Sequence, residues 1–163
     1  MAPRNSDAAP VMVPELVLTR VFNAPCSLVF ACWTEGRHLK EWSAPHGFTI
    51  PYSEGKAEPG GHWRACMKKP DGSELWLGGI YKEVELNRKL VMTHAWQQED
   101  GKLGGETLIT VLFEDLGGKT RVVFTQTGFT SAADRDGHAG GWSECFERLE
   151  ALLSKLSNMG IRS

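Results

Sequence analysis

The pattern of hydrophobic and polar positions predicts one early strand, two short helices and then a long series of strands. Residues 15–22 alternate and are rich in Leu, Val and Thr, which is typical of a half-buried strand. Residues 27–34 and 36–42 have the spacing of short helices. Alternating segments bounded by turn residues then predict further strands over 48–53, 62–68, 75–84, 90–96, 107–114 and 120–127.

The last segment, residues 131–156, has the period of a long amphipathic helix, with Trp142, Phe146 and Leu149 on one face. Glycines stand in its first half, and each costs roughly 1 kcal/mol relative to alanine inside a helix. They predict either a helix that begins later or a backbone that another group approaches closely. These glycines are Gly137, Gly140 and Gly141.

The order of elements favours an α+β domain. Strands follow one another without intervening helices, which argues against a parallel sheet. An antiparallel sheet with one apolar face can bury that face against the apolar stripe of the long helix. A length of 163 residues suits one domain, which we expect over residues 14–158, between a flexible N-terminal tail at 1–13 and a C-terminal tail at 159–163.

Composition and charge exclude several classes of function. The net charge is −2 and no long run of Lys or Arg occurs, so we expect no nucleic-acid partner. No apolar run approaches the ~20 residues of a membrane span, and no signal peptide is apparent, so we expect a cytoplasmic protein. The cysteines lack zinc-site spacing and are expected to be reduced, buried thiols; they are Cys26, Cys32, Cys66 and Cys145.

Three motifs that resemble catalytic or metal sites lack the context that such sites need. Residues 117–120, GGKT, resemble the end of a phosphate-binding loop, but Phe113 replaces the first glycine and the segment joins two strands. Residues 141–145, GWSEC, lack the last glycine of a nucleophile elbow. The histidines are not paired at metal-ligand spacing, so we expect no metal and no cofactor.

The six tryptophans are the strongest indication of a binding cavity. Trp combines a large apolar face with an N–H that needs a partner, which suits the wall of a pocket. A core position is the commoner explanation for any one Trp taken alone, but less so for all six together. A shift of one residue in a strand would exchange inward and outward positions. The expected cavity residues are Trp33, Trp42, Phe48, Trp63, Met67, Trp76, Met92, His94, Trp96, Phe124, Gln126, Gly141, Trp142 and Phe146.

His94 is the one weak candidate for a catalytic group. It alternates with Met92 and Trp96, so it faces either an apolar interior or the opposite side of the sheet. An inward His94 can serve as a general acid or base, with a carboxylate such as Glu106 as the other candidate. The sequence shows no partner arranged beside His94, so no catalytic residue is assigned.

Short motifs in a fixed order resemble a known family over residues 16–153. The resemblance is to bacterial proteins grouped with the C-terminal domain of the activator of heat-shock protein 90 ATPase, within the START-like, helix-grip (SRPBCC) superfamily. The motifs are LTRVFNAP (18–25), VFACWT (29–34), LKEW (39–42), PGGHW (59–63), DG (71–72), GIYKEV (79–84), KLVMT (89–93), GKTRV (118–122), TGF (127–129) and GW (141–142).

This resemblance implies a curved antiparallel sheet of six or seven strands around the long C-terminal helix, with a hydrophobic cavity between them. It also implies that the first half of that helix forms one wall of the cavity. On this view Trp142 projects inward, and the glycines at 137, 140 and 141 leave room for a ligand to approach the backbone.

The resemblance is compatible with three functions. The favoured one is binding of a small hydrophobic or aromatic molecule without a reaction. The alternatives are a cyclase- or hydrolase-like enzyme that uses His94, and a co-chaperone-like protein. The eukaryotic activator has an additional N-terminal domain that residues 1–13 cannot replace, which disfavours a chaperone partner. An exposed sheet edge or a helix could pair two copies of the chain as a homodimer.

Overall fold

The computed structural model describes residues 15–160. The expected tail at 1–13, and residues 161–163 of the expected C-terminal tail, lie outside the described residues. The elements follow the predicted order with boundaries that differ by few residues. They are β1 (Leu16–Phe22), α2 (Cys26–Thr34), α3 (Gly36–Trp42), β2 (Thr49–Gly55), β3 (His62–Lys68), β4 (Glu74–Glu85), β5 (Lys89–Trp96), β6 (Thr107–Asp115), β7 (Thr120–Thr127) and α4 (Ala132–Asn158).

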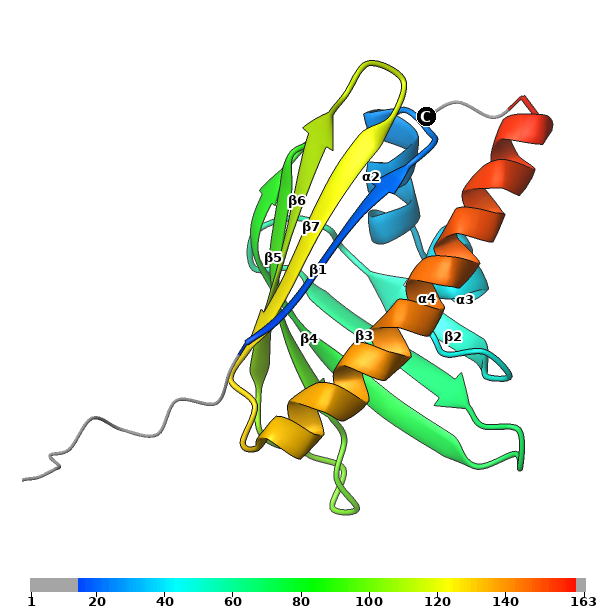
Figure 1. The fold of residues 1–163 in the computed structure, drawn as a ribbon. Coiled ribbons are helices and arrows are strands. Elements are labelled where there is room, and N and C mark those ends of the chain that lie inside the picture. The colour runs from blue at the N-terminus through cyan, green and yellow to red at the C-terminus, as the bar shows by residue number, and fades with distance from the viewer. Residues whose placement is uncertain (1–14, 161–163) are drawn as a thin grey trace, which may run out of the picture.

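The strands form one seven-stranded antiparallel sheet in the order β1-β7-β6-β5-β4-β3-β2. Its curvature is plain in Figure 1, where the sheet bends around α4 while α2 and α3 lie between sheet and helix. A register shift between Tyr81 and Glu83, where β4 pairs with β5, marks a bulge, and bulges increase local bending. The predicted α+β fold is therefore confirmed. Strands β1 and β2 are the two edges, and edge-to-edge dimerisation stays a prediction.

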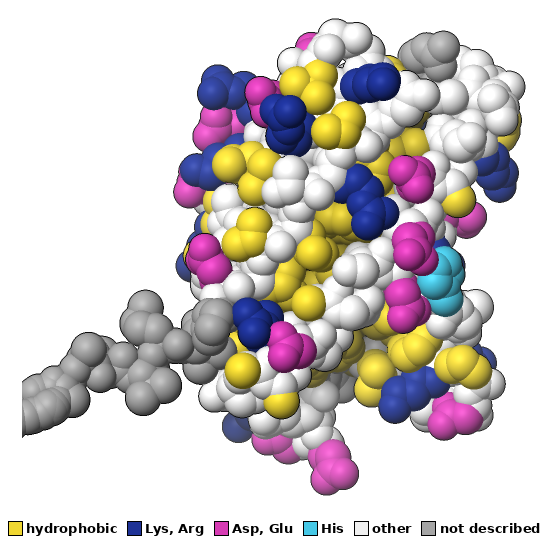
Figure 2. Space-filling view, viewed as in Figure 1, with side chains coloured by type: hydrophobic (Ala, Val, Ile, Leu, Met, Phe, Trp, Pro, Cys, Tyr) yellow, Lys and Arg dark blue, Asp and Glu magenta, His cyan; other side chains and the backbone are white. Residues whose placement is uncertain are grey.

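Helix α4 is attached to the sheet by its C-terminal half. Phe146 and Leu149 are buried against the sheet, together with Leu153 one turn later, whereas no residue of α4 before Cys145 is buried. Figure 2 shows hydrophobic side chains along the seam between β1 and α4, flanked by charged side chains on the helix. The first turns of α4 are thus outside the main core, which the helix reaches at Ala139 and Trp142, both partly buried against it.

The glycines do not delay the start of this helix. Ser131 caps it, because the Ser131 hydroxyl accepts a hydrogen bond from the backbone N–H of Asp134 at 3.0 Å. A Cβ atom added at Gly137 or Gly140 would meet no described atom within 4 Å, and at Gly141 it would meet only a proline carbon at 3.7 Å. No described protein group approaches these backbones closely, and the approach of a ligand to them stays a prediction.

The motifs that lack catalytic context form ordinary local structure. Gly117 and Gly118 have positive φ values of 78° and 92° in the hairpin between β6 and β7. Ser143 lies inside α4 and donates to the carbonyl of Ala139 at 2.9 Å. The four cysteines are buried and free. Within residues 15–160 no helix is long and apolar enough to cross a membrane, and no cluster of metal-ligand side chains occurs.

Candidate functional site

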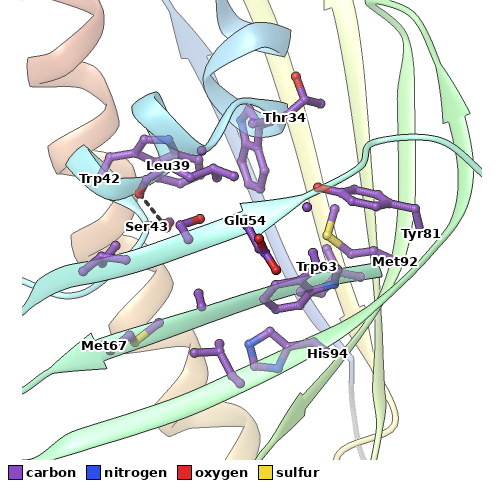
Figure 3. A pocket seen from close by; sticks show the side chains of 18 of the residues that line it. Thr34, Leu39, Trp42, Ser43, Glu54, Trp63, Met67, Tyr81, Met92 and His94 are labelled. Atoms are coloured by element: carbon purple, nitrogen blue, oxygen red, sulfur yellow. Dashed lines mark hydrogen bonds between the residues drawn. The ribbon is translucent and has the colours of Figure 1, made fainter. Parts of the chain in front are cut away.

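An apolar cavity of about 80 Å³, here the inner cavity, lies between the concave face of the sheet, helices α2 and α3, and Trp142 of α4. Figure 3 shows Trp42 and Leu39 of α3 on one side of it, and Trp63, Met92 and His94 of the sheet on the other. Sequence-predicted residues in its lining are Trp33, Trp42, Trp63, Met67, Met92, His94 and Trp142.

A second space of about 370 Å³, here the outer hollow, opens between the first half of α4, the 43–48 loop and the ends of β3, β4 and β5. The small residues Ala133, Gly137 and Gly141 lie at four-residue spacing on one face of α4. This face of the helix lines the outer hollow. The outer hollow also contains the predicted residues Phe48 and Trp96. The side chains that line both spaces are Ser43, Met67, His94 and Trp142.

Trp142 is held in place by a chain of hydrogen bonds that reaches the sheet. Its indole N–H donates to Oε1 of Gln126 at 2.9 Å, and Nε2 of Gln126 donates to Oγ1 of Thr107 at 2.8 Å. Thr107 in turn donates to the backbone carbonyl of His94 at 3.1 Å. Gln126 is fully buried, so both ends of its amide are satisfied inside the protein. This network orients Trp142 between the two spaces.

His94 faces inward and is almost entirely buried, with 5% of its surface exposed. Its ring lies 5.4 Å from that of Trp96, 5.8 Å from that of Trp63 and 6.1 Å from that of His138. Burial, and secondarily repulsion by His138, lowers the pKa of His94 from 6.5 to about 4. His94 is therefore a neutral imidazole at physiological pH. Among the described residues no carboxylate hydrogen-bonds its ring, so nothing orients it as a general base.

His138 belongs to a separate network at the rim of the outer hollow. Trp96 donates its indole N–H to Nε2 of His138 at 3.3 Å, and Nδ1 of His138 lies 2.9 Å from the backbone carbonyl of Asp134. This pattern assigns the proton of a neutral His138 to Nδ1. Trp96 and the first turns of α4 are thereby joined across the hollow.

The 43–48 loop is fixed to α4 by Arg148. Its Nη1 donates to the carbonyls of Ala44, Pro45 and Phe48 at 2.7, 3.0 and 3.2 Å. His46 reinforces the attachment, since its backbone N–H donates to a carboxylate of α4 at 3.0 Å. One guanidinium thus holds the loop that forms a wall of the outer hollow. The sequence analysis did not single out Arg148, because its partners are backbone carbonyls a hundred residues away.

Four predicted cavity residues line neither space. Phe124 and Phe146 are buried in the core behind Trp142, with ring centroids 5.8 Å apart, and Gln126 supports Trp142 through its amide. Trp76 requires a correction. It lies on the outer face of β4, where the Arg64 guanidinium stands 4.1 Å above its ring.

Trp76 lies on the outer face because successive side chains of a strand point to opposite faces of the sheet. Leu75 and Leu77 face the outer hollow and the inner cavity respectively, so Trp76 between them points away. The carboxylate candidate Glu106 is exposed and lines neither space. Among the cavity residues that sequence reasoning missed, Tyr81 shares the inward phase of Leu77 on β4, which alternation could have revealed. The missed residues include Leu39, Ile50, Leu77, Tyr81 and Ile109.

Comparison with known proteins identifies the family. Residues 23–154 match the family model described as "Activator of Hsp90 ATPase homolog 1-like protein". The chain belongs to this family. No curated protein matches it. The resemblance inferred from the motifs is thereby confirmed, and the family is compatible with ligand binding or with a co-chaperone-like role.

Solved structures that resemble this Activator of Hsp90 ATPase homolog 1-like chain show the same fold. The AHSA1 protein from Silicibacter pomeroyi is 22% identical, with 86% of this chain and 98% of that one covered and a TM-score of 0.79. A protein from Arthrobacter aurescens, solved by NMR, is 24% identical over 88% of this chain and 87% of its own, with a TM-score of 0.80. A protein from Chromobacterium violaceum is 24% identical over 85% and 96%, with a TM-score of 0.78.

Proposed function

We propose that the chain binds a small hydrophobic or aromatic molecule in the inner cavity and that the outer hollow is its mouth. The observation that carries this proposal is an apolar cavity walled by four tryptophans from four different elements: Trp33, Trp42, Trp63 and Trp142. Ligand sites are typically concave and apolar with a few polar groups that orient the ligand. The neutral imidazole of His94 is one such group.

The first half of α4 supports the same proposal. Helix glycines cost stability, yet Gly137 and Gly141 stand over open space in the outer hollow and contact almost nothing. A ligand that passes between α4 and the 43–48 loop can approach this backbone, whereas alanine side chains would narrow the path. The stability given up at these positions is consistent with a role in access rather than in folding.

Binding without a reaction is the function we favour. Catalysis by His94 needs a group that orients the imidazole and sets its pKa near the working pH. The described surroundings of His94 are aromatic, and its pKa of about 4 makes it a weak base. His94 therefore contributes a hydrogen-bonding edge to the wall of the cavity.

The test is native mass spectrometry of the purified protein, followed by organic extraction and by tryptophan fluorescence with a panel of hydrophobic ligands. We expect a bound molecule, or a saturable fluorescence change, that is lost in Trp142→Ala. The matched control is Trp76→Ala, which removes a tryptophan from the outer face and should leave binding intact. An empty protein that responds to none of the panel contradicts the proposed function.

A further inference from the structure

We propose that the inner cavity selects an uncharged ligand carrying a hydrogen-bond acceptor, such as a ketone oxygen, and that Tyr81 and Trp33 donate to this acceptor. The inference rests on the proposed function and adds the chemical class of the ligand. It is carried by the charges of the lining, by the buried N–H of Trp33, which has no acceptor, and by the hydroxyl of Tyr81, which hydrogen-bonds no residue of the described chain.

The lining offers no positive charge to an anionic ligand. Among its described residues there is no Lys or Arg, and its one charged side chain is Glu54, an exposed residue of β2 whose carboxylate points toward Trp63 in Figure 3. His94 is neutral because burial lowers its pKa to about 4. A carboxylate or phosphate in this cavity would be both desolvated and unpaired, which is strongly unfavourable. Fatty acids and phosphorylated molecules are therefore poor ligands.

Tyr81 supplies the first donor. Its side chain is 3% exposed, and Figure 3 shows its ring extending from β4 with the hydroxyl oxygen toward the middle of the cavity. No residue of the described chain hydrogen-bonds this hydroxyl. Burial raises the pKa of Tyr81 to about 12, so the hydroxyl keeps its proton and remains a donor. A buried tyrosine hydroxyl normally has a partner, and a ligand oxygen fits that role.

Trp33 supplies the second donor, and it differs from the other tryptophans of the lining. Trp42, Trp63 and Trp142 each donate the indole N–H to a protein oxygen, at 2.8, 3.0 and 2.9 Å. The N–H of Trp33 is buried and has no partner. A buried donor without an acceptor destabilises the empty protein, and an acceptor on the ligand would relieve this. Both donors turn a positive hydrogen toward the ligand, which also disfavours a cation.

The test compares four probes that share one benzene ring: acetophenone, its hydrocarbon isostere α-methylstyrene, benzoate and phenyltrimethylammonium. Affinities are measured by NMR titration of the full chain. We expect acetophenone to bind at least about tenfold more tightly than α-methylstyrene, the factor that one net hydrogen bond of about 1.4 kcal/mol gives. Benzoate and phenyltrimethylammonium should bind more weakly than the hydrocarbon, because the lining offers the anion no positive side chain and offers the cation only the solvent-exposed carboxylate of Glu54.

Tyr81→Phe should abolish most of the preference for acetophenone while the affinity for α-methylstyrene changes less than about twofold. Tyr52→Phe is the matched control, since Tyr52 lies on the outer face against Trp76, with ring centroids 5.6 Å apart. In the unmodified protein the indole N–H resonance of Trp33 should move downfield with acetophenone and not with α-methylstyrene. This measurement is made on the unmodified protein, so it does not depend on whether a variant of Trp33 folds.

Equal affinity for acetophenone and α-methylstyrene, or tighter binding of either charged probe, overturns the inference and leaves the proposed function intact. An unmoved Trp33 resonance with bound acetophenone removes Trp33 from the proposal. Failure of all four probes to bind contradicts both the inference and the cavity function.

Discussion

Replacing Gln126 with Leu tests the hydrogen-bond chain that positions Trp142. Gln126 is fully buried on β7, and Leu has a similar volume, so the substitution removes the amide without leaving a large void. Two hydrogen bonds are lost, each with a net value of about 1 kcal/mol, and the N–H of Trp142 is left without its acceptor. The greater hydrophobicity of Leu offsets part of this, so we expect a loss of about 2 kcal/mol.

The assay is urea unfolding followed by tryptophan fluorescence, with a thermal melt as a second measure. A loss of about 2 kcal/mol lowers the melting temperature of a domain of this size by about 4–8 °C. Gln98→Leu is the matched control, because Gln98 is exposed, and it should stay within about 0.5 kcal/mol of the unmodified protein.

Thr107→Val extends the test along the same chain. Its hydroxyl accepts from Gln126 and donates to the carbonyl of His94, so its loss should be coupled to that of Gln126. We expect the double variant Gln126→Leu/Thr107→Val to be less destabilised than the sum of the single variants, by at least about 0.5 kcal/mol. If Gln126→Leu is as harmless as Gln98→Leu, or the two losses simply add, then these bonds do not act as one network and do not fix Trp142.

Three further predictions concern His94 and the glycines. Because folding lowers the pKa of His94 from 6.5 to about 4, the unfolded chain takes up the proton first. The free energy of unfolding should therefore fall as the pH falls from 6.5 to 4, and urea titrations should find this slope reduced in His94→Asn. Gly79→Ala should prevent stable folding, since its Cβ would lie 2.0 Å from a backbone oxygen of β5. Gly105→Ala is the control, because its Cβ would meet nothing within 4 Å, and circular dichroism should find the folded spectrum only in this second variant. Gly137→Ala and Gly140→Ala should each raise stability by up to about 1 kcal/mol, but calorimetry should find ligand binding weakened only at Gly137, which lines the outer hollow. Equal binding by both variants would contradict a role for the outer hollow in access.

Several elements of this fold are readable from the sequence because strands such as β1, β6 and β7 bury one face and expose the other, whereas β5 is buried on both faces. The alternation in β7 is the clearest example, since Val122, Phe124 and Gln126 are buried and the residues between them are not. The same alternation places the polar side chain of Gln126 in the interior, and the sequence of β7 alone gives no reason for a polar residue there. Its explanation is Trp142, on a different element and sixteen residues away.

The residues that line the cavity are harder to predict, because a residue of a type common in cavities can lie at a strand position that faces outward. Trp76 has the type of a cavity residue and the phase of an outer one, and the phase decides where it lies. Tyr81 has the inward phase but follows two glycines and precedes a bulge, which obscure the alternation. Contacts between distant elements, such as Arg148 with the 43–48 loop, depend on the assembled fold and leave no local pattern.

The division of α4 into a buried half and an overhanging half has an evolutionary consequence. Substitutions at positions such as 133, 137 and 141 reshape the outer hollow without removing a single core contact, so they can accumulate at little cost to folding. Phe146 and Leu149 meanwhile keep the helix on the sheet. Solved structures at 22–24% identity share this fold. If the proposed function holds, the ligand that the outer hollow admits can therefore change while the architecture is kept.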